Sequence, residues 1–343
     1  MDTRLHALTQ WVQQQPGFEQ AALSPVSGDA SFRRYFRVAT PGSRCIAMDA
    51  PPEHEDCRPF VAIAQHWLSQ GVSVPEIYAE DLALGFLLLE DFGDNLMLGA
   101  LDNDNADQLY TGALDELCRI QQIKDHPDHP LPLYDNELLN REMALFPDWL
   151  LTRQLGIDLS NGEQCMLDTA FAFLRESALA QPEVTVHRDY HSRNLLIRKG
   201  LSAPGVIDFQ DAVRGPVTYD LVSLLKDCYI RWPEQQINRW IEYYRTISME
   251  AGLHHADPDT FRQWLELMGM QRHLKAAGIF ARLAIRDGKQ SYLADIPRTV
   301  HYLVEASGRQ PALRHLNGWL RDVVEPKLTT LSAQPQTVDT GGH

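Results

Sequence analysis

A short polar run in the second half of the chain has the residue types that phosphoryl transfer requires. It contains His187, Arg188 and Asp189, with Asn194 five residues after the aspartate and Asp208 further on. A carboxylate such as Asp189 can orient an attacking hydroxyl and accept its proton. The amide oxygen of Asn194 and the carboxylate of Asp208 are hard donors of the kind that Mg²⁺ prefers. These residues together predict a phosphotransfer site that uses ATP and Mg²⁺.

Each of these residues taken singly has an ordinary structural explanation, because Asp and Asn in loops commonly form turns or cap helices. The combination is more specific than its parts. Asn194 is followed directly by the apolar residues 195–197, and Asp208 stands between two apolar residues. This order of base, metal ligand, short strand and second metal ligand is typical of the catalytic loop and metal-binding segment of protein kinases.

Two stretches with different hydrophobic patterns must position this run. Between residues 23 and 90, short apolar segments alternate with turn residues, and the segment 60–70 has helical spacing, which predicts five strands and one helix. A short amphipathic helix is expected before them, over residues 3–15. After residue 90 the pattern is helical, apart from the β-rich runs 184–186 and 205–208.

The expected fold class is therefore α+β, with a bilobal arrangement similar to that of protein kinases. We predict a small β-rich N-lobe over residues 1–90 that binds the nucleotide. A large, mainly helical C-lobe over residues 91–331 is expected to carry catalysis and the acceptor. The polar residues 332–343, with their Gly and Pro, are expected to be disordered.

Composition excludes several other classes of protein. Of 343 residues, 46 are acidic and 31 are basic, so the net charge of −15 argues against a nucleic-acid partner and against an anionic membrane surface. No apolar run approaches the roughly 20 residues of a membrane helix, and the N-terminus lacks the layout of a signal peptide. Five scattered cysteines without a Cys-x-x-Cys pair argue against a disulfide framework or a zinc site. We expect a cytoplasmic protein, and composition leaves its oligomeric state open.

From about residue 23 to residue 330, the chain resembles the aminoglycoside/choline phosphotransferase group of kinase-like enzymes. Within that group it is most similar to bacterial kinases that act on the anomeric hydroxyl of N-acetylmuramate and N-acetylglucosamine in peptidoglycan recycling. The closer resemblance is carried by residues 27–37, 47–52, 207–212 with Gly215 and Pro216, 271–275 and 278–282.

The resemblance implies a role for each residue of the site. Asp189 would be the general base, and Asn194 and Asp208 would hold Mg²⁺. The hinge 89–92 would bind adenine through backbone groups, and Asp220 would brace the catalytic loop, unless it is a plain helix N-cap. The loop over the ATP phosphates would consist of Ser27, Gly28, Asp29, Ala30, Ser31 and Phe32, and the hinge contributes Glu90 and Phe92.

The strand that carries an ATP-pairing lysine in protein kinases has no lysine here. Met48 stands at the expected position and has no charge. We expect Arg33 or Arg34, from the preceding strand, to supply the charge, unless Mg²⁺ carries more of the neutralisation. The alternative for either arginine is a position on a solvated strand face, with no role in ATP binding. Gln210 stands where protein kinases have the glycine of Asp-Phe-Gly, which favours an enzyme that is constitutively competent.

The acceptor is expected to bind beside Asp189, against the helical lobe. Carboxylates and aromatic rings suit sugar hydroxyls and ring faces, and an arginine suits a lactyl carboxylate. For each candidate, the alternative to acceptor binding is an ion pair on the protein surface. Glu142 and Asp148 are weaker candidates. The candidates are Arg193, Asp211, Arg214, Asp227 and Tyr229.

Three functions are open at this point. The first is an ATP-dependent kinase for the anomeric hydroxyl of N-acetylmuramate or N-acetylglucosamine. The second is a phosphotransferase for an aminoglycoside, choline or homoserine. The third is a nucleotide-binding scaffold without catalysis, which only Met48 supports; the intact Asp189 speaks against it, because a scaffold has no need of a base.

Overall fold

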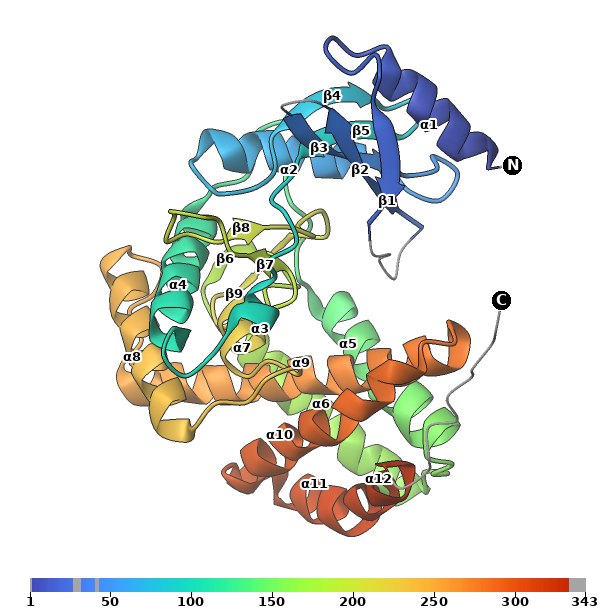
Figure 1. Ribbon diagram of the computed structural model, residues 1–343. Helices are drawn as coiled ribbons and strands as arrows, with labels where there is room; N and C mark the ends of the chain where they lie inside the picture. The colour runs from blue at the N-terminus through green and yellow to red at the C-terminus, as the bar shows by residue number, and fades with distance from the viewer. Residues whose placement is uncertain (1, 27–31, 41–42, 333–343) are drawn as a thin grey trace. The chain divides into compact units, whose positions relative to one another are not determined.

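The computed structural model describes residues 2–26, 32–40 and 43–332. It divides into two compact units, each built from two separate stretches of the chain (Figure 1). Unit 1 consists of residues 1–132 and 187–213, and unit 2 consists of residues 133–186 and 214–343. The predicted catalytic run, residues 187–208, therefore groups with the N-terminal sheet. The lobes expected at 1–90 and 91–331 stay a prediction, and the expected disordered tail lies outside the described residues except for Ser332.

An antiparallel sheet of five strands forms the N-terminal part of unit 1 (Figure 1). The helix α1 packs against it, because Leu8, Trp11 and Val12 share one helix face and join Phe36 and Phe86 in a buried core. The sheet order is β1-β2-β3-β5-β4. The elements are α1 (Thr3–Gln13), β1 (Ala22–Pro25), β2 (Arg34–Thr40), β3 (Ser43–Asp49), α2 (Arg58–Ser69), β4 (Ile77–Asp81) and β5 (Phe86–Glu90).

The rest of unit 1 is formed by two helices and a small hairpin from the catalytic run. The helices are α3 (Met97–Ala100) and α4 (Ala106–Gln122). The strands β7 (Leu195–Leu196) and β8 (Gly205–Val206) pair antiparallel. The backbone N–H of Val206 donates to the carbonyl of Ser73 at 2.7 Å, which ties the hairpin to the segment that follows α2.

Unit 2 is mainly helical, with one two-stranded sheet made by β6 and β9. The helix α9 is 29 residues long and is buried along much of its length, and Figure 1 shows it as the long orange helix. The elements are α5 (Asn136–Leu145), the π-helix η1 (Phe146–Gln154), α6 (Asn161–Leu179), β6 (Glu183–Val186), β9 (Val213–Pro216), α7 (Tyr219–Leu225), α8 (Glu234–Glu250), α9 (Pro258–Arg286), η2 (Gln290–Asp295), α10 (Ile296–Gly308), η3 (Pro311–Leu313), α11 (Arg314–Trp319), η4 (Leu320–Val324) and α12 (Glu325–Ser332).

The predicted elements agree with this structure. The five strands and one helix expected between residues 23 and 90 are β1 to β5 and α2, and the helix expected over residues 3–15 is α1. The runs expected at 184–186 and 205–208 are β6 and β8, although β8 ends at Val206. The five cysteines form no disulfide bond with one another. Within the described ranges, no helix is both long and apolar enough to cross a membrane.

Candidate active site

The β7–β8 hairpin brings the two predicted Mg²⁺ ligands together. Because Leu195 pairs with Val206, the residue before β7 and the residues after β8 lie at the same end of the hairpin. The side-chain amide nitrogen of Asn194 lies 3.3 Å from Oδ2 of Asp208 and donates to it. The backbone N–H of Ile207 donates to the carbonyl of Asn194 at 3.1 Å. Two short strands are thus enough to place two distant residues in contact.

Asp189 belongs to the same hydrogen-bonded cluster. Its carbonyl oxygen accepts from the amide nitrogen of Asn194 at 3.0 Å and from the backbone N–H of His191 at 3.1 Å. Its side chain is half-buried. The amide nitrogen of Asn194 donates to both Asp189 and Asp208, so these two contacts do not use the amide oxygen that is predicted to bind Mg²⁺.

The buried imidazole of His187 positions both parts of this cluster. Its Nε2 lies 3.0 Å from the carbonyl oxygen of Ile207, and its Nδ1 accepts from the backbone N–H of Asp189 at 3.2 Å. Burial lowers the pKa of His187 to about 4, so the ring is neutral at pH 7. A neutral ring with its proton on Nε2 satisfies both contacts at once.

The backbone is strained at two positions of the cluster. Among the described residues, Arg188 and Asp208 are the non-glycine residues with positive φ, at 77° and 67°. Such a conformation costs an L-residue about 1–2 kcal/mol. The side chain of Gln210 donates to Oδ1 of Asp208 at 2.8 Å, and that of Arg188 donates to the carbonyl of Asp211 at 3.3 Å. Strain held in place by such bonds clusters at functional sites.

Aromatic packing anchors the strained segment. Phe209 is fully buried, and its ring centroid lies 4.8 Å from that of Phe60 and 5.8 Å from that of Trp67, both on α2. In addition, the hydroxyl of Tyr190 donates to the carbonyl of Ala113 on α4 at 2.8 Å. The catalytic run is therefore held by two helices of unit 1.

The predicted adenine hinge is joined to the hairpin by Arg198. This guanidinium donates to Oε1 of Glu90 at 2.8 Å and to the hydroxyl of Ser73 at 2.9 Å, and it lies 4.4 Å over the ring of Phe92. Gly205 also lies close to that ring, because an added Cβ there would be 2.4 Å from Cδ2 of Phe92. The hinge and the strands that carry the metal ligands are thus packed together, although nothing in the sequence marked Arg198.

Most of the predicted phosphate loop, Ser27, Gly28, Asp29, Ala30 and Ser31, lies outside the described residues.

Phe32, the last residue of that loop, and Arg33, which follows it, are described. The ring of Phe32 is 63% exposed and stacks on His54 with centroids 4.5 Å apart. Arg33 is buried, and its Nε lies 3.8 Å from a carboxylate oxygen of Glu55. The role of Arg33 as the source of the charge that Met48 lacks stays a prediction.

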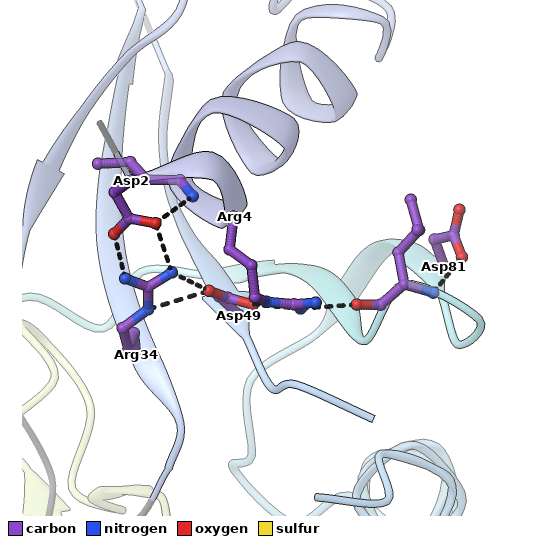
Figure 2. Close-up of polar contacts among 7 residues, drawn as sticks. Asp2, Arg4, Arg34, Asp49 and Asp81 are labelled. Carbon is purple, nitrogen blue, oxygen red and sulfur yellow. Dashed lines mark hydrogen bonds and ion pairs between the residues drawn. The ribbon is translucent and has the colours of Figure 1, made fainter. Parts of the chain in front are cut away.

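Arg34 is bound on both sides by carboxylates (Figure 2). Its guanidinium donates to Asp49 and to Asp2, and the fully buried Asp49 also accepts from Arg4 at 2.9 Å. Met48, beside Asp49 on β3, is buried and uncharged. Of the two arginines considered as the replacement for lysine, Arg34 is therefore already neutralised.

The predicted acceptor residues fall in both units. Arg193 and Asp211 are exposed residues of unit 1. In unit 2, Arg214 donates to the hydroxyl of Thr185 at 3.0 Å and to a backbone carbonyl of β6.

Two other acceptor candidates lie together in unit 2. The buried carboxylate of Asp227 accepts from the backbone N–H of Tyr229 at 3.0 Å. The ring of Tyr229 contacts that of Phe280 on α9, with centroids 6.0 Å apart. Asp220 is fully buried on α7, and its bracing role stays a prediction.

Unit 2 contains a buried polar network that sequence reasoning missed. Lys275 on α9 lies 3.1 Å from Oε1 of Glu142 on α5, and Gln271 donates to Oε2 of the same carboxylate at 3.2 Å. Tyr134 also donates to Glu142, and Lys275 donates to the hydroxyl of Tyr219 at 2.9 Å. The available signal was Gln271 and Lys275, four residues apart in a helix whose residues around them are mostly buried.

The donors of the site fit Mg²⁺ held largely by phosphate oxygens. In the part of the chain that the structure describes, no group of three His, Cys, Asp or Glu side chains could hold a metal ion. Asn194 and Asp208 instead offer one amide oxygen and one carboxylate. Mg²⁺ in kinase sites is bound by one or two protein oxygens together with substrate phosphates, and this set matches that arrangement.

Comparison with known proteins identifies the class of enzyme. The model of the phosphotransferase enzyme family matches residues 22–264, from β1 to the first turns of α9. The chain belongs to the phosphotransferase enzyme family. This phosphotransferase is 45% identical over 326 residues to a Pseudomonas putida protein named N-acetylmuramate/N-acetylglucosamine kinase, a match that covers 92% of this chain and 95% of the relative.

Two further comparisons agree with this family. A Pseudomonas aeruginosa protein of the same name is 46% identical over 299 residues, covering 86% of this chain and 87% of the relative. A choline kinase of Streptococcus pneumoniae has the same fold, with a TM-score of 0.63 at 11% identity over 88% of this chain and 99% of that one. The predicted α+β, protein-kinase-like fold and the predicted ATP-dependent phosphotransferase class are confirmed. The resemblance to the amino-sugar kinases within this group is confirmed as well.

Proposed function

We propose that this enzyme transfers the γ-phosphoryl group of ATP to the anomeric hydroxyl of N-acetylmuramate and of N-acetylglucosamine, in the recycling of peptidoglycan. The products are the sugar 1-phosphate and ADP. The observation that carries the proposal is the cluster of Asp189, Asn194 and Asp208. It lies in a chain whose Pseudomonas relatives bear the name of that kinase and align with it along most of its length.

In the proposed reaction, the carboxylate of Asp189 orients the anomeric hydroxyl and accepts its proton. The sugar oxygen forms a bond to the γ-phosphorus, the bond from that phosphorus to the β,γ-bridging oxygen breaks, and ADP leaves with the electron pair. Asn194 and Asp208 would hold Mg²⁺, which neutralises phosphate charge when bound. Because an anomeric hydroxyl is more acidic than an ordinary alcohol, an aspartate without unusual activation suffices as the base.

The remaining predicted residues complete the proposal. Phe32 and the preceding loop would cover the phosphates of ATP, Arg33 would supply the charge that Met48 lacks, and the hinge at Glu90 and Phe92 would bind adenine. The proposed acceptor residues are Arg193, Asp211, Arg214, Asp227 and Tyr229. We further propose a cytoplasmic enzyme without a nucleic-acid or membrane partner, because ATP and five cysteines without a disulfide bond fit that compartment.

A direct test is ADP release by the purified chain with a panel of acceptors. We expect turnover that requires Mg²⁺ with N-acetylmuramate and N-acetylglucosamine, and none with kanamycin, choline or homoserine. The product should be identified by ³¹P NMR as a sugar 1-phosphate, with its phosphorus coupled to the anomeric proton. EDTA should abolish turnover, and excess Mg²⁺ should restore it.

Other outcomes would reject the proposal in distinct ways. Turnover of choline, homoserine or an aminoglycoside alone would agree with the phosphotransferase family but reject the proposed amino-sugar acceptor. A sugar 6-phosphate as product would support the sugar as the acceptor but exclude its anomeric hydroxyl as the group that is phosphorylated. Nucleotide binding without ADP release for any acceptor would favour the scaffold.

A further inference from the structure

Gln210 contacts the side chain of Asp208, the second of the two predicted Mg²⁺ ligands. Its amide nitrogen donates to Oδ1 of Asp208 at 2.8 Å. The opposite orientation of the amide would place its oxygen against a carboxylate oxygen, so the carboxylate fixes which end of the amide faces it. Protein kinases have a glycine at this position of their metal-binding segment, and a glycine has no side chain that could make this contact.

The turn that carries Gln210 is held at several points. The backbone N–H of Ala212 donates to the carbonyl of Phe209 at 3.0 Å. The side chain of Arg188 donates to the carbonyl of Asp211 at 3.3 Å. The ring of Phe209 is fully buried and contacts two aromatic rings of α2. Because Gln210 lies between these fixed points, the place from which its side chain reaches the carboxylate is well defined.

The contact from Gln210 is the stronger of two hydrogen bonds that the carboxylate of Asp208 accepts from side-chain amides. The other comes from the amide nitrogen of Asn194, which lies 3.3 Å from Oδ2. The usual N–H···O distance is about 2.7–3.2 Å, so this second contact is long and weak. Asp208 also has a positive φ of 67°. The orientation of its carboxylate therefore depends mainly on Gln210.

Asp49 in the same unit shows how a carboxylate with a purely structural role is held. It is fully buried and accepts from the guanidinium groups of Arg4 and Arg34, which neutralise its charge within the protein (Figure 2). The contact from Gln210 comes instead from a neutral amide, which orients the carboxylate of Asp208 without adding positive charge. A carboxylate oriented by a neutral donor is suited to bind a cation.

We propose that Gln210 is a positioning residue for Mg²⁺, because its hydrogen bond holds the carboxylate of Asp208 in a metal-binding orientation before metal and nucleotide arrive. This inference rests on the proposed function, since it takes Asp208 as a Mg²⁺ ligand. Side chains that hydrogen-bond a ligating carboxylate fix its orientation, and their removal typically lowers metal affinity about 10- to 100-fold. Gln210 acts through Asp208 and is not itself proposed as a ligand.

The test compares Gln210→Met with Asp208→Asn and with the matched control Gln65→Met, all in the full chain. Methionine is similar to glutamine in length but has no N–H group to donate. Gln65 is an exposed glutamine of α2 in the same unit. Calorimetry gives the dissociation constant of a non-hydrolysable ATP analogue for each protein, once with excess Mg²⁺ and once with EDTA, without any acceptor sugar.

In Mg²⁺, we expect Gln210→Met to raise the dissociation constant of the analogue roughly 10-fold or more. In EDTA, the change should stay below about 2-fold, because the contact acts through the metal. Asp208→Asn should show the same pattern with a larger loss, and Gln65→Met should bind like wild type in both conditions. For Gln210→Met, an equal loss with and without Mg²⁺, or no loss in Mg²⁺, would overturn the inference.

A melting temperature for each variant separates metal binding from a structural role. Gln210→Met removes one hydrogen bond, and it also removes an amide oxygen that is buried without a hydrogen-bond partner among the described residues. These two changes act on stability in opposite directions, so the melting temperature without ligands should stay near that of wild type. Mg²⁺ with the analogue should raise the melting temperature of wild type more than that of Gln210→Met. A lower melting temperature without ligands, together with an equal rise on ligand addition, would assign Gln210 to stability alone and overturn the inference.

These measurements contain no sugar, which keeps the inference separate from the proposed function. An enzyme that turns over no amino sugar would reject the proposed acceptor, and a Mg²⁺-dependent loss in Gln210→Met would still support the inference. Wild-type protein that binds the analogue equally with and without Mg²⁺ would reject the inference, whichever acceptor the enzyme uses.

Discussion

The catalytic run of unit 1 and the helix α9 of unit 2 share one kind of contact, made by a buried histidine. Each holds a buried neutral histidine whose Nε2 bonds a backbone carbonyl that directly precedes an aspartate. His187 contacts the carbonyl of Ile207 at 3.0 Å, and His273 contacts the carbonyl of Lys226 at 2.9 Å. Burial lowers the pKa of the first to about 4 and that of the second to about 3.

The two regions differ in how far apart their partners lie in the chain. In unit 1, Asn194 and Asp208 are 14 residues apart, and a hairpin of two short strands joins them. In unit 2, Gln271 reaches Glu142 across 129 residues. A polar cluster formed by neighbouring strands can be recognised in the sequence from the spacing of its residues. A polar cluster formed by packed helices shows in the sequence only as polar residues on an apolar helix face.

The largest effect should come from Asp189→Asn. Removal of the base should lower kcat by a factor on the order of 10³, because the hydroxyl then has no positioned proton acceptor. Since the variant keeps the backbone contacts to Asn194 and His187, the dissociation constant of ATP should change little. Steady-state kinetics and calorimetric titration with a non-hydrolysable ATP analogue measure the two quantities. Turnover retained in Asp189→Asn would remove this residue from the chemistry.

In unit 2, Glu142→Gln should act on stability. It leaves the ammonium of Lys275 buried without its counter-charge, which costs about 3 kcal/mol or more in the free energy of unfolding. Urea unfolding of the single variant and of the double variant Glu142→Gln/Lys275→Met should show that the second change recovers part of the loss. An unchanged single variant would mean that the ion pair does not contribute.

Acidification should destabilise both regions through their histidines. With a pKa near 4 in the folded state and about 6.5 when unfolded, His187 binds fewer protons folded than unfolded between these values. The free energy of unfolding therefore rises with pH in this window, and about 3 kcal/mol is lost as pH falls from 6.5 to 4. His273 acts with the same sign. Urea unfolding at several pH values should give a shallower slope for His187→Gln and for His273→Gln than for wild type. Equal slopes would show that burial of the ring does not perturb its titration.

The smallest effect distinguishes the neighbouring arginines of the N-terminal sheet. Arg33→Ala should raise the KM for ATP roughly 10-fold, because a charge-assisted contact to phosphate is worth about 1.5 kcal/mol or more. Arg34→Ala should instead lower the melting temperature, since it frees the buried carboxylate of Asp49 from one of its two arginines. If both variants bind ATP normally, Mg²⁺ carries the charge that Met48 lacks.

The sequence was sufficient for the fold class and for the cluster around Asp189, because alternating apolar residues and loop spacing encode strands and hairpins directly. It did not reveal Arg198, whose partners Glu90 and Phe92 precede it by more than 100 residues. It offered Arg34 as an alternative to Arg33, since only tertiary structure shows that Asp2 and Asp49 already neutralise Arg34. Contacts between distant segments were the part that pattern alone could not supply.

The order of the two units along the chain has a consequence for engineering this enzyme. The polypeptide changes unit three times, after residues 132, 186 and 213. A chimaera with a relative made by one crossover would therefore mix parental sequences inside at least one unit. Exchange of the whole of unit 2 between homologues needs junctions at all three positions, and we expect libraries recombined at those junctions to retain more folded members than libraries with random breakpoints.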